Sequence, residues 1–196
     1  MTAGIIGELL LSVDRILISI FFEDIQLGYY GFSSNFFKGV RIIGVAVSMM
    51  VLPRIVKSFA QQDYQQMLRY SLIQQWSSFG LMGITSILTG ISLFYLIPMF
   101  MPEYESSLRV SYILLGVATL IPLGFYPNIL NTIGKQKVYL MTQIFVIGLN
   151  VIISTSFIYL SYGIDGVALG SLISMIAYII LIRNLGKNAV HHLIND

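Results

Sequence analysis

The sequence contains no cysteine and few charged residues. Of its 196 residues, 10% are Asp, Glu, Lys or Arg, against about 25% in an ordinary soluble domain. The lack of cysteine excludes disulfides and thiolate metal sites, and His191 and His192 have no acid nearby except Asp196, so no metal site is expected. The net charge of +2, without a basic run among aromatics, argues against nucleic acid as a partner.

Hydrophobic residues, by contrast, make up 56% of the chain and form six stretches of helix length. A helix needs about 20 mainly apolar residues to cross the hydrocarbon of a bilayer. We expect spans over residues 3–22, 28–53, 72–100, 108–130, 138–161 and 164–183. The sequence therefore predicts an all-α membrane protein, in which residues 1–196 form a single bundle of six antiparallel transmembrane helices in contact with membrane lipids.

The connections between these stretches alternate in charge. Lys and Arg follow the second, fourth and sixth stretches, whereas the other three connections hold acids, and only Arg109 departs from this pattern. Because short loops rich in Lys and Arg are retained in the cytoplasm, both termini are expected there. The polar segment 58–70 is interpreted either as a simple loop or as a helix lying in the membrane interface.

Ionisable residues interrupt the first two apolar stretches. They are Glu8, Asp14, Arg15, Lys38 and Arg41. Each would cost about 2.5 to 3.5 kcal/mol at the centre of a lipid-facing helix, so they are expected to face protein or water. If the two helices form a hairpin that turns near Ile25, Asp14 and Lys38 lie at similar depth, near the middle of the membrane.

Helix geometry places several of these residues on shared faces. Ser34, Lys38 and Arg41 follow an i, i+4, i+7 spacing on the second helix, and Glu8 and Arg15 share a face of the first. We interpret them as a polar seam on the inner side of the hairpin.

This seam has three positive and two negative groups, and Asn35 is a further candidate for its lining. A hydrated, net-cationic lumen suits an anionic or polyhydroxylated substrate, with a coupling proton or sodium ion at Asp14 or Glu8 and no other cofactor. The alternative is that the charges neutralise one another as structural ion pairs, although such pairs seldom stabilise more than apolar packing does.

Two prolines, Pro122 and Pro127, fall within the fourth stretch. Each removes a backbone donor and clashes with the preceding turn, so the helix is expected to bend or break there. The break would serve either as a hinge or cavity wall or as a static kink.

Small residues recur at four-residue spacing in the sixth stretch, at Gly166, Gly170 and Ser174. They leave a smooth face that another helix can approach closely. We interpret this face as a helix contact rather than a substrate site.

Several short motifs resemble one family of transporters. Asp14-Arg15 within an apolar helix, the run 27–30 (Leu-Gly-Tyr-Tyr), and a long helix closing on residues 52–54 (Leu-Pro-Arg) resemble the start of the second half of polysaccharide flippases. The runs 133–137, 149–150 and 163–171 resemble the late helices of the same proteins. The likeness is to Wzx-type O-antigen flippases of the multidrug/oligosaccharidyl-lipid/polysaccharide exporter superfamily, and it covers essentially the whole chain.

The resemblance implies a function in the bacterial inner (plasma) membrane. Such flippases move undecaprenyl-diphosphate-linked oligosaccharides to the outer leaflet for O-antigen, lipopolysaccharide and other surface polysaccharide biosynthesis, by alternating access between two bundles of six helices. Asp14 and Arg15 match an acidic-basic pair of the family, and Lys38 and Arg41 fall where cavity-lining basic residues are common, whereas Glu8 matches no family motif. Because members have about twelve spans, we expect this chain to act as a partial or split transporter, the C-terminal half, that pairs with a second six-helix half or with itself.

Two other classes of protein remain as alternatives. A drug or metabolite antiporter of the same superfamily would more often use acidic cavity residues. A membrane scaffold would need none of the five charges. An enzyme is not expected, because the spans carry no paired-Asp, Ser-base or His-Glu metal motif.

Overall fold

The computed structural model describes residues 5–124 and 126–195, which fold almost entirely into helices. The side chains of residues 5–10, 126–127, 187 and 189–195 lie outside this description. The elements are α1 (Ile5–Phe21), α2 (Asp24–Ala60), α3 (Tyr64–Phe100), the 3-10 turn η1 (Pro102–Ser107), α4 (Leu108–Leu120), the 3-10 turn η2 (Ile121–Gly124), α5 (Tyr126–Thr132), α6 (Gln136–Tyr159) and α7 (Gly163–Asn195).

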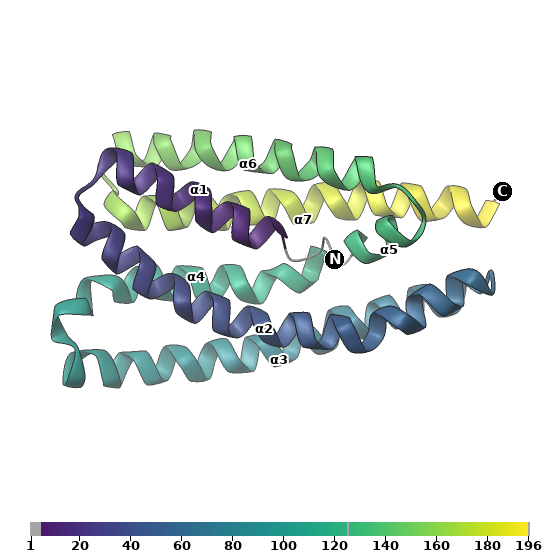
Figure 1. Cartoon of the computed structure of the whole chain (residues 1–196), viewed down its shortest axis with the longest axis horizontal. Coiled ribbons are helices and arrows are strands. Elements are labelled where there is room, and N and C mark those ends of the chain that lie inside the picture. The colour runs from purple at the N-terminus through teal and green to yellow at the C-terminus, as the bar shows by residue number, and fades with distance from the viewer. Residues whose placement is uncertain (1–4, 125, 196) are drawn as a thin grey trace.

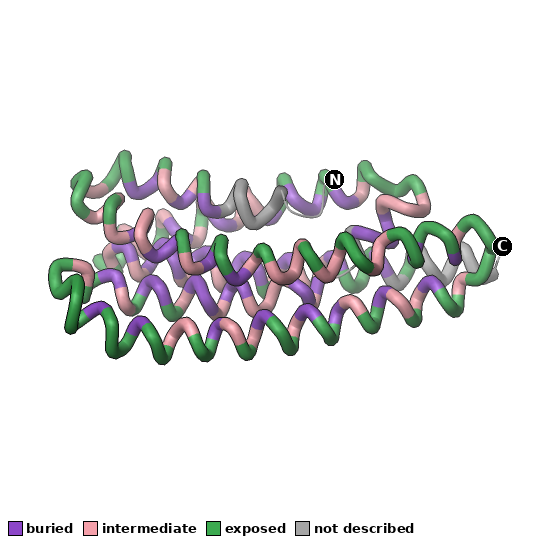
Figure 2. Tube along the Cα trace, turned by 60° about the horizontal axis from the view of Figure 1, so that its bottom comes forward, coloured by how far each residue is buried: buried purple, intermediate pink, exposed green. Residues whose placement is uncertain are grey.

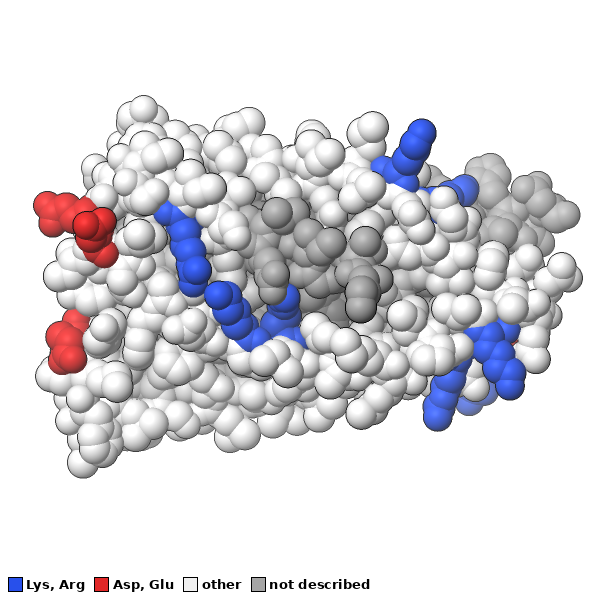
Figure 3. Space-filling model, in the orientation of Figure 1, with Lys and Arg blue, Asp and Glu red and all other residues white. Residues whose placement is uncertain are grey.

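The long helices run side by side in an elongated bundle, and successive ones are antiparallel (Figure 1). The connections α1–α2, α3–α4 and α6–α7 therefore meet at one end of the bundle, and α2–α3 and α5–α6 meet at the other. Acidic side chains lie at the first end, and most basic side chains of the connections lie at the opposite end (Figure 3). The alternation of charge along the sequence thus becomes a separation of charge along the bundle.

Five helical segments are long and apolar enough to cross a membrane, judged by length and composition over the described residues. They are Asp24–Ala60, Tyr64–Phe100, Pro102–Gly124, Gln136–Tyr159 and Gly163–Gly186. The described part of α1 has 17 residues, which is shorter than the roughly 20 residues of a full crossing. The chain is thus a multi-pass membrane protein, while the expected count of six spans is not confirmed.

The polar segment 58–70 is neither a loop nor an interfacial helix, so both interpretations of it were wrong. α2 continues to Ala60 and α3 begins at Tyr64, so the segment forms the ends of two long helices joined by a tight turn. Gln62 adopts a positive φ of 58° in this turn. The carboxylate of Asp63 then accepts a hydrogen bond from the Gln66 backbone at 2.8 Å and caps α3, which satisfies one of the free N–H groups at the start of a helix.

The helix break that the prolines predict is present in the structure. α4 ends at Leu120, and a 3-10 turn that contains Pro122 separates it from the short helix α5. Pro122 is buried, whereas the side chain of Pro127 lies outside the described part. The close approach of η2 to α7 requires a glycine at residue 124, since an added Cβ there would lie 2.9 Å from the Tyr178 ring.

Apolar side chains fill the space between the helices and also cover the outside of the bundle. Buried and exposed positions alternate along each helix, with the exposed ones on the outer face (Figure 2). Many exposed side chains are large and apolar, among them Ile84 and Phe94 on α3 and Ile144 and Ile152 on α6, each at least 59% exposed. Such a surface suits lipid rather than water.

The small-residue face of α7 packs against α6, which confirms the expected helix contact. An added Cβ at Gly170 would lie 3.0 Å from the backbone of Ser154, and one at Gly166 would lie 2.8 Å from the Phe157 Cβ. Ser174 continues this face and is fully buried. Glycine therefore permits the close approach of these two helices.

Candidate functional site

Asp14 forms the centre of a buried polar network. Its side chain is fully buried, and its Oδ2 atom accepts hydrogen bonds from the Tyr30 hydroxyl and from Ser171 Oγ, both at 2.5 Å. Asn150 donates to Ser171 Oγ at 2.9 Å. One carboxylate of α1 is thus linked to α2, α6 and α7.

Two acceptor oxygens of this network lack a hydrogen-bond partner among the described residues. They are Oδ1 of Asp14 and Oδ1 of Asn150, both buried. Ser174 Oγ, one turn beyond Ser171 on α7, is likewise buried without a partner in that part of the chain. Leaving a buried polar group unpaired costs about 1 to 3 kcal/mol, so these atoms are candidates for contact with a bound proton or a hard cation, which prefers oxygen ligands.

Basic side chains gather beside this network, on the face formed by α1 and α2. Arg15 is half-buried, and its Nη2 donates to Ser34 Oγ at 2.5 Å. Arg41 is half-buried, whereas Asn35 and Lys38 are exposed. Figure 3 shows a row of basic atoms lying over α1 and α2, between the acidic and the basic end of the molecule.

A small cavity opens between these two helices. It has a volume of about 240 Å³ and is lined by Leu11, Ser12, Arg15 and Lys38. Nε of Arg15 is buried and has no acceptor among the described residues. The cavity is smaller than the roughly 300 to 1,000 Å³ of typical ligand pockets, so it suits one small anionic group such as a phosphate.

The residues of the polar seam that the sequence predicts on the inner side of the hairpin do not all face the same way in the structure. Asp14 points into the bundle toward α7, whereas Arg15 and Lys38 line the cavity at its surface. No ion pair joins Asp14 to Lys38, so this acid is held by hydroxyl groups and not by the opposite charge at similar depth. The side chain of Glu8 lies outside the described part of the structure.

Three other members of the Asp14 network were not identified as site residues from the sequence. Tyr30, Asn150 and Ser171 are polar positions within apolar helices, which is the signal that pointed to Asp14 itself. Two of them lie more than 130 residues along the chain from Asp14, and hydropathy does not show which distant helices meet.

A second polar cluster lies beside the proline break and was also missed. Asn128 at the start of α5 donates to Ser48 Oγ at 3.1 Å and to Gln74 Oε1 at 3.2 Å, and Gln74 donates to Ser48 Oγ at 3.0 Å. These bonds tie α5 to α2 and α3. They fix the position of the segment that follows Pro122.

Comparison with known proteins identifies the fold. No family model and no curated protein sequence matches the chain. A solved structure does match: the inward-facing conformation of a multidrug resistance MATE family transporter of the MOP superfamily, with a TM-score of 0.68 and 20% sequence identity. The match covers 89% of this chain and 41% of the transporter, so the chain has the fold of rather less than half of that protein.

Proposed function

We propose that the chain is one lobe of an ion-coupled membrane transporter that moves an anionic, lipid-linked oligosaccharide across the membrane. The observation that carries this proposal is the arrangement of one buried carboxylate and a cationic cavity on the same two helices, α1 and α2. The fold shared with part of a MATE transporter supports the transporter class. The substrate class rests on the charge of the cavity and on the resemblance to Wzx-type flippases.

The cavity between Arg15 and Lys38 is the proposed site for the diphosphate of an undecaprenyl-linked sugar. An arginine donates several fixed N–H groups to phosphate oxygens, and a lysine adds a mobile point charge. The Nε of Arg15, which has no acceptor among the described residues, supplies one such donor. Exposed Asn35, one turn before Lys38, would contact a neighbouring sugar hydroxyl.

Asp14 is the proposed site of the coupling ion, either a proton or sodium. The Oδ1 atoms of Asp14 and Asn150, which have no partner in the described part of the chain, belong to the same network. Together they would provide oxygen ligands for a sodium ion or a carboxylate for a proton. Ion binding there would alter the packing of α1 against α6 and α7. Such a change is what alternating access requires, since an ion drives a conformational change only through different affinities for the two states.

A second bundle is proposed to cover the cationic face. Lys38 is exposed on a helix long and apolar enough to span the membrane, and an uncompensated charge facing hydrocarbon is costly. A second six-helix half or another copy of the chain would enclose Arg15 and Lys38 in a hydrated cavity. In this arrangement α1 completes six spans, both termini lie in the cytoplasm of a bacterial inner membrane, and Pro122 and Pro127 form a hinge.

The drug or metabolite antiporter remains the second candidate function. The similar solved structure is that of a multidrug resistance transporter, and the buried Asp14 network would serve ion coupling in either protein. The candidate functions differ in substrate charge, since a cationic drug would be repelled by Lys38 and Arg15. A non-transporting scaffold would require neither the network nor the cavity.

The test compares neutralised variants in cells whose surface polysaccharide depends on the chain. Lys38→Gln and Arg15→Gln are expected to reduce surface polysaccharide while leaving the amount of protein in the membrane unchanged. Lys57→Gln, at an exposed basic position near the end of α2, is the matched control. Normal polysaccharide with altered drug tolerance would instead establish the antiporter, and no effect on either would support the scaffold.

A further inference from the structure

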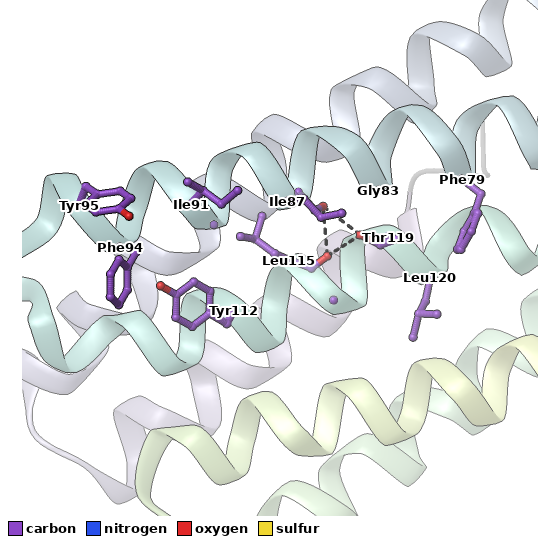
Figure 4. Close-up of a pocket in the computed structure, with 13 residues that line it drawn as sticks. Phe79, Gly83, Ile87, Ile91, Phe94, Tyr95, Tyr112, Leu115, Thr119 and Leu120 are labelled. Atoms are coloured by element: carbon purple, nitrogen blue, oxygen red, sulfur yellow. Dashed lines mark hydrogen bonds between the residues drawn. The ribbon is translucent and has the colours of Figure 1, made fainter.

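A second, larger cavity lies on the outside of the bundle, between α3 and α4. It has a volume of about 750 Å³. Phe94 and Tyr112 lie at one end of it, and Phe79 and Leu120 lie at the other (Figure 4). We call it the α3–α4 groove; its remaining lining is Gly83, Ser86, Ile87, Gly90, Ile91, Tyr95, Leu115, Gly116 and Thr119.

The middle of the groove offers no free hydroxyl donor among the described residues. The hydroxyls of Ser86 and Thr119 lie 2.9 Å apart, and both are within hydrogen-bonding distance of the Leu115 carbonyl, at 3.3 and 2.9 Å (Figure 4). Their hydrogens are therefore used within the protein. The walls around them are apolar, so the groove suits a ligand that forms no hydrogen bonds along most of its length.

The dimensions of the groove indicate the shape of that ligand. From Phe79 to Tyr95 the helix rises by about 24 Å, at about 1.5 Å per residue. A volume of about 750 Å³ over this length gives a mean cross-section of about 30 Å². A helix with its side chains is about 10 to 12 Å across, so a helix from another protein or from a second copy would seat only one row of side chains in this groove. A single extended hydrocarbon chain can instead follow the groove along its whole length.

The tyrosines at one end indicate where a polar head would lie. Tyr95 is 68% exposed and Tyr112 is 40% exposed. Both lie toward the end of the bundle that carries Glu103 and Glu105. Tyrosine is enriched where hydrocarbon meets the headgroup region, because its ring is apolar and its hydroxyl is polar.

We propose that the α3–α4 groove binds an acyl chain of a membrane phospholipid from the leaflet at the acidic end of the bundle, with the headgroup beside Tyr95 and Tyr112. This site lies between different helices from the cationic cavity of α1 and α2. The inference is therefore independent of what the chain transports.

The test uses phospholipids that carry a photoreactive group within one acyl chain. The full chain is reconstituted in vesicles of phosphatidylethanolamine and phosphatidylglycerol, irradiated, and mapped by mass spectrometry. Residues of the groove are expected to be labelled several-fold more than equally exposed apolar residues of α6, such as Ile144.

A glycine in the groove allows the site to be blocked. An added Cβ at Gly116 would meet no atom within 4 Å, so the position accepts a side chain, and Gly116→Leu, which extends that side chain into the groove, is expected to reduce labelling there several-fold. Gly148→Leu on α6 places the same side chain at another glycine with open space and is expected to leave it unchanged. If Gly116→Leu does not accumulate in the membrane, Ile91→Trp fills the same groove from α3.

Three outcomes would overturn the proposal. One is equal labelling of the groove and of α6, which would show ordinary contact with bulk lipid. Another is loss of groove labelling on addition of undecaprenyl phosphate, which would assign the groove to a polyprenyl chain. The third is crosslinking between two copies of the Ile87→Cys variant through its single thiol, which would show that a second chain covers the groove.

Discussion

Two replacements of Asp14, by Leu and by Asn, distinguish the contribution of its hydrogen bonds to stability from its proposed role in binding an ion. Asp14→Leu removes the acceptor of two fully buried hydroxyl groups, those of Tyr30 and Ser171, and each unpaired group costs about 1 to 3 kcal/mol. The substitution also removes a carboxylate that is costly to bury, so the net loss is expected near 2 kcal/mol. In a chain of this size that corresponds to a fall in Tm of roughly 4 to 8 °C.

Asp14→Asn is the matched variant. Its amide oxygen still accepts from Tyr30 and Ser171, so its Tm is expected within a few degrees of the unmodified chain. It lacks the negative charge that would hold a cation. An ion that binds only the folded state stabilises it by about 2.7 kcal/mol when the ion concentration is about 100 times its Kd. If sodium is the coupling ion, it should therefore raise the Tm of the unmodified chain and not that of Asp14→Asn.

The assay is thermal unfolding of the purified full chain in detergent, with and without sodium and with potassium as the control salt. Equal Tm values for Asp14→Leu and the unmodified chain would show that the network contributes no stability. A sodium-dependent rise that persists in Asp14→Asn would place the ion elsewhere. If sodium has no effect on the unmodified chain, the coupling ion is a proton or the coupling role of Asp14 is wrong, and transport measured across a proton gradient decides between the two.

The remaining predictions concern packing. Gly170→Ala forces a Cβ against the backbone of Ser154 and is expected to destabilise the chain by about 1 to 3 kcal/mol, measured as a fall in Tm. Gly148→Ala, which has open space around it, should be neutral or stabilise by up to about 1 kcal/mol. Asn128→Ala removes the bonds that hold α5 and leaves Gln74 Oε1 without its donor, so amide hydrogens of residues 126–132 are expected to exchange faster while those of α6 do not change.

The helices of this bundle could be predicted from the sequence because each helix depends on residues within its own segment and its flanking connections. Apolar runs of helix length and short polar connections located α6 to within two residues at each end. The two prolines located the break after α4, and glycine spacing indicated that one face of α7 meets another helix, which the structure shows to be α6. The C-terminal end of α2 and the start of α3 were missed because hydropathy marks where a helix leaves the membrane, whereas the helix itself continues until a turn such as Gln61–Asp63.

The site was only partly predictable, because its geometry depends on the rotation of α1. The depth of a residue along a hairpin follows from counting residues, and this count predicted similar depths for Asp14 and Lys38. The direction of a side chain around the helix does not follow from that count. Asp14 and Arg15 are adjacent, so they point about 100° apart on a helix of 3.6 residues per turn. The packing of α1 against α6 and α7, as well as α2, turned Asp14 inward to Ser171 and left Arg15 beside Ser34.

Because Asp14 and Arg15 are adjacent in α1, ion binding at Asp14 and anion binding beside Arg15 are expected to influence each other. Because both belong to one rigid helix, a rotation of α1 that opened Asp14 to water would also move Arg15 away from Ser34 and out of the cavity that it shares with Lys38. An ion that holds Asp14 in its buried position would therefore stabilise the cationic cavity. Linkage is reciprocal, so an anion bound between Arg15 and Lys38 should raise the affinity of Asp14 for the ion by the same factor. Two neighbouring residues on one helix are thus sufficient to link the two sites, without a chain of contacts between distant parts of the bundle.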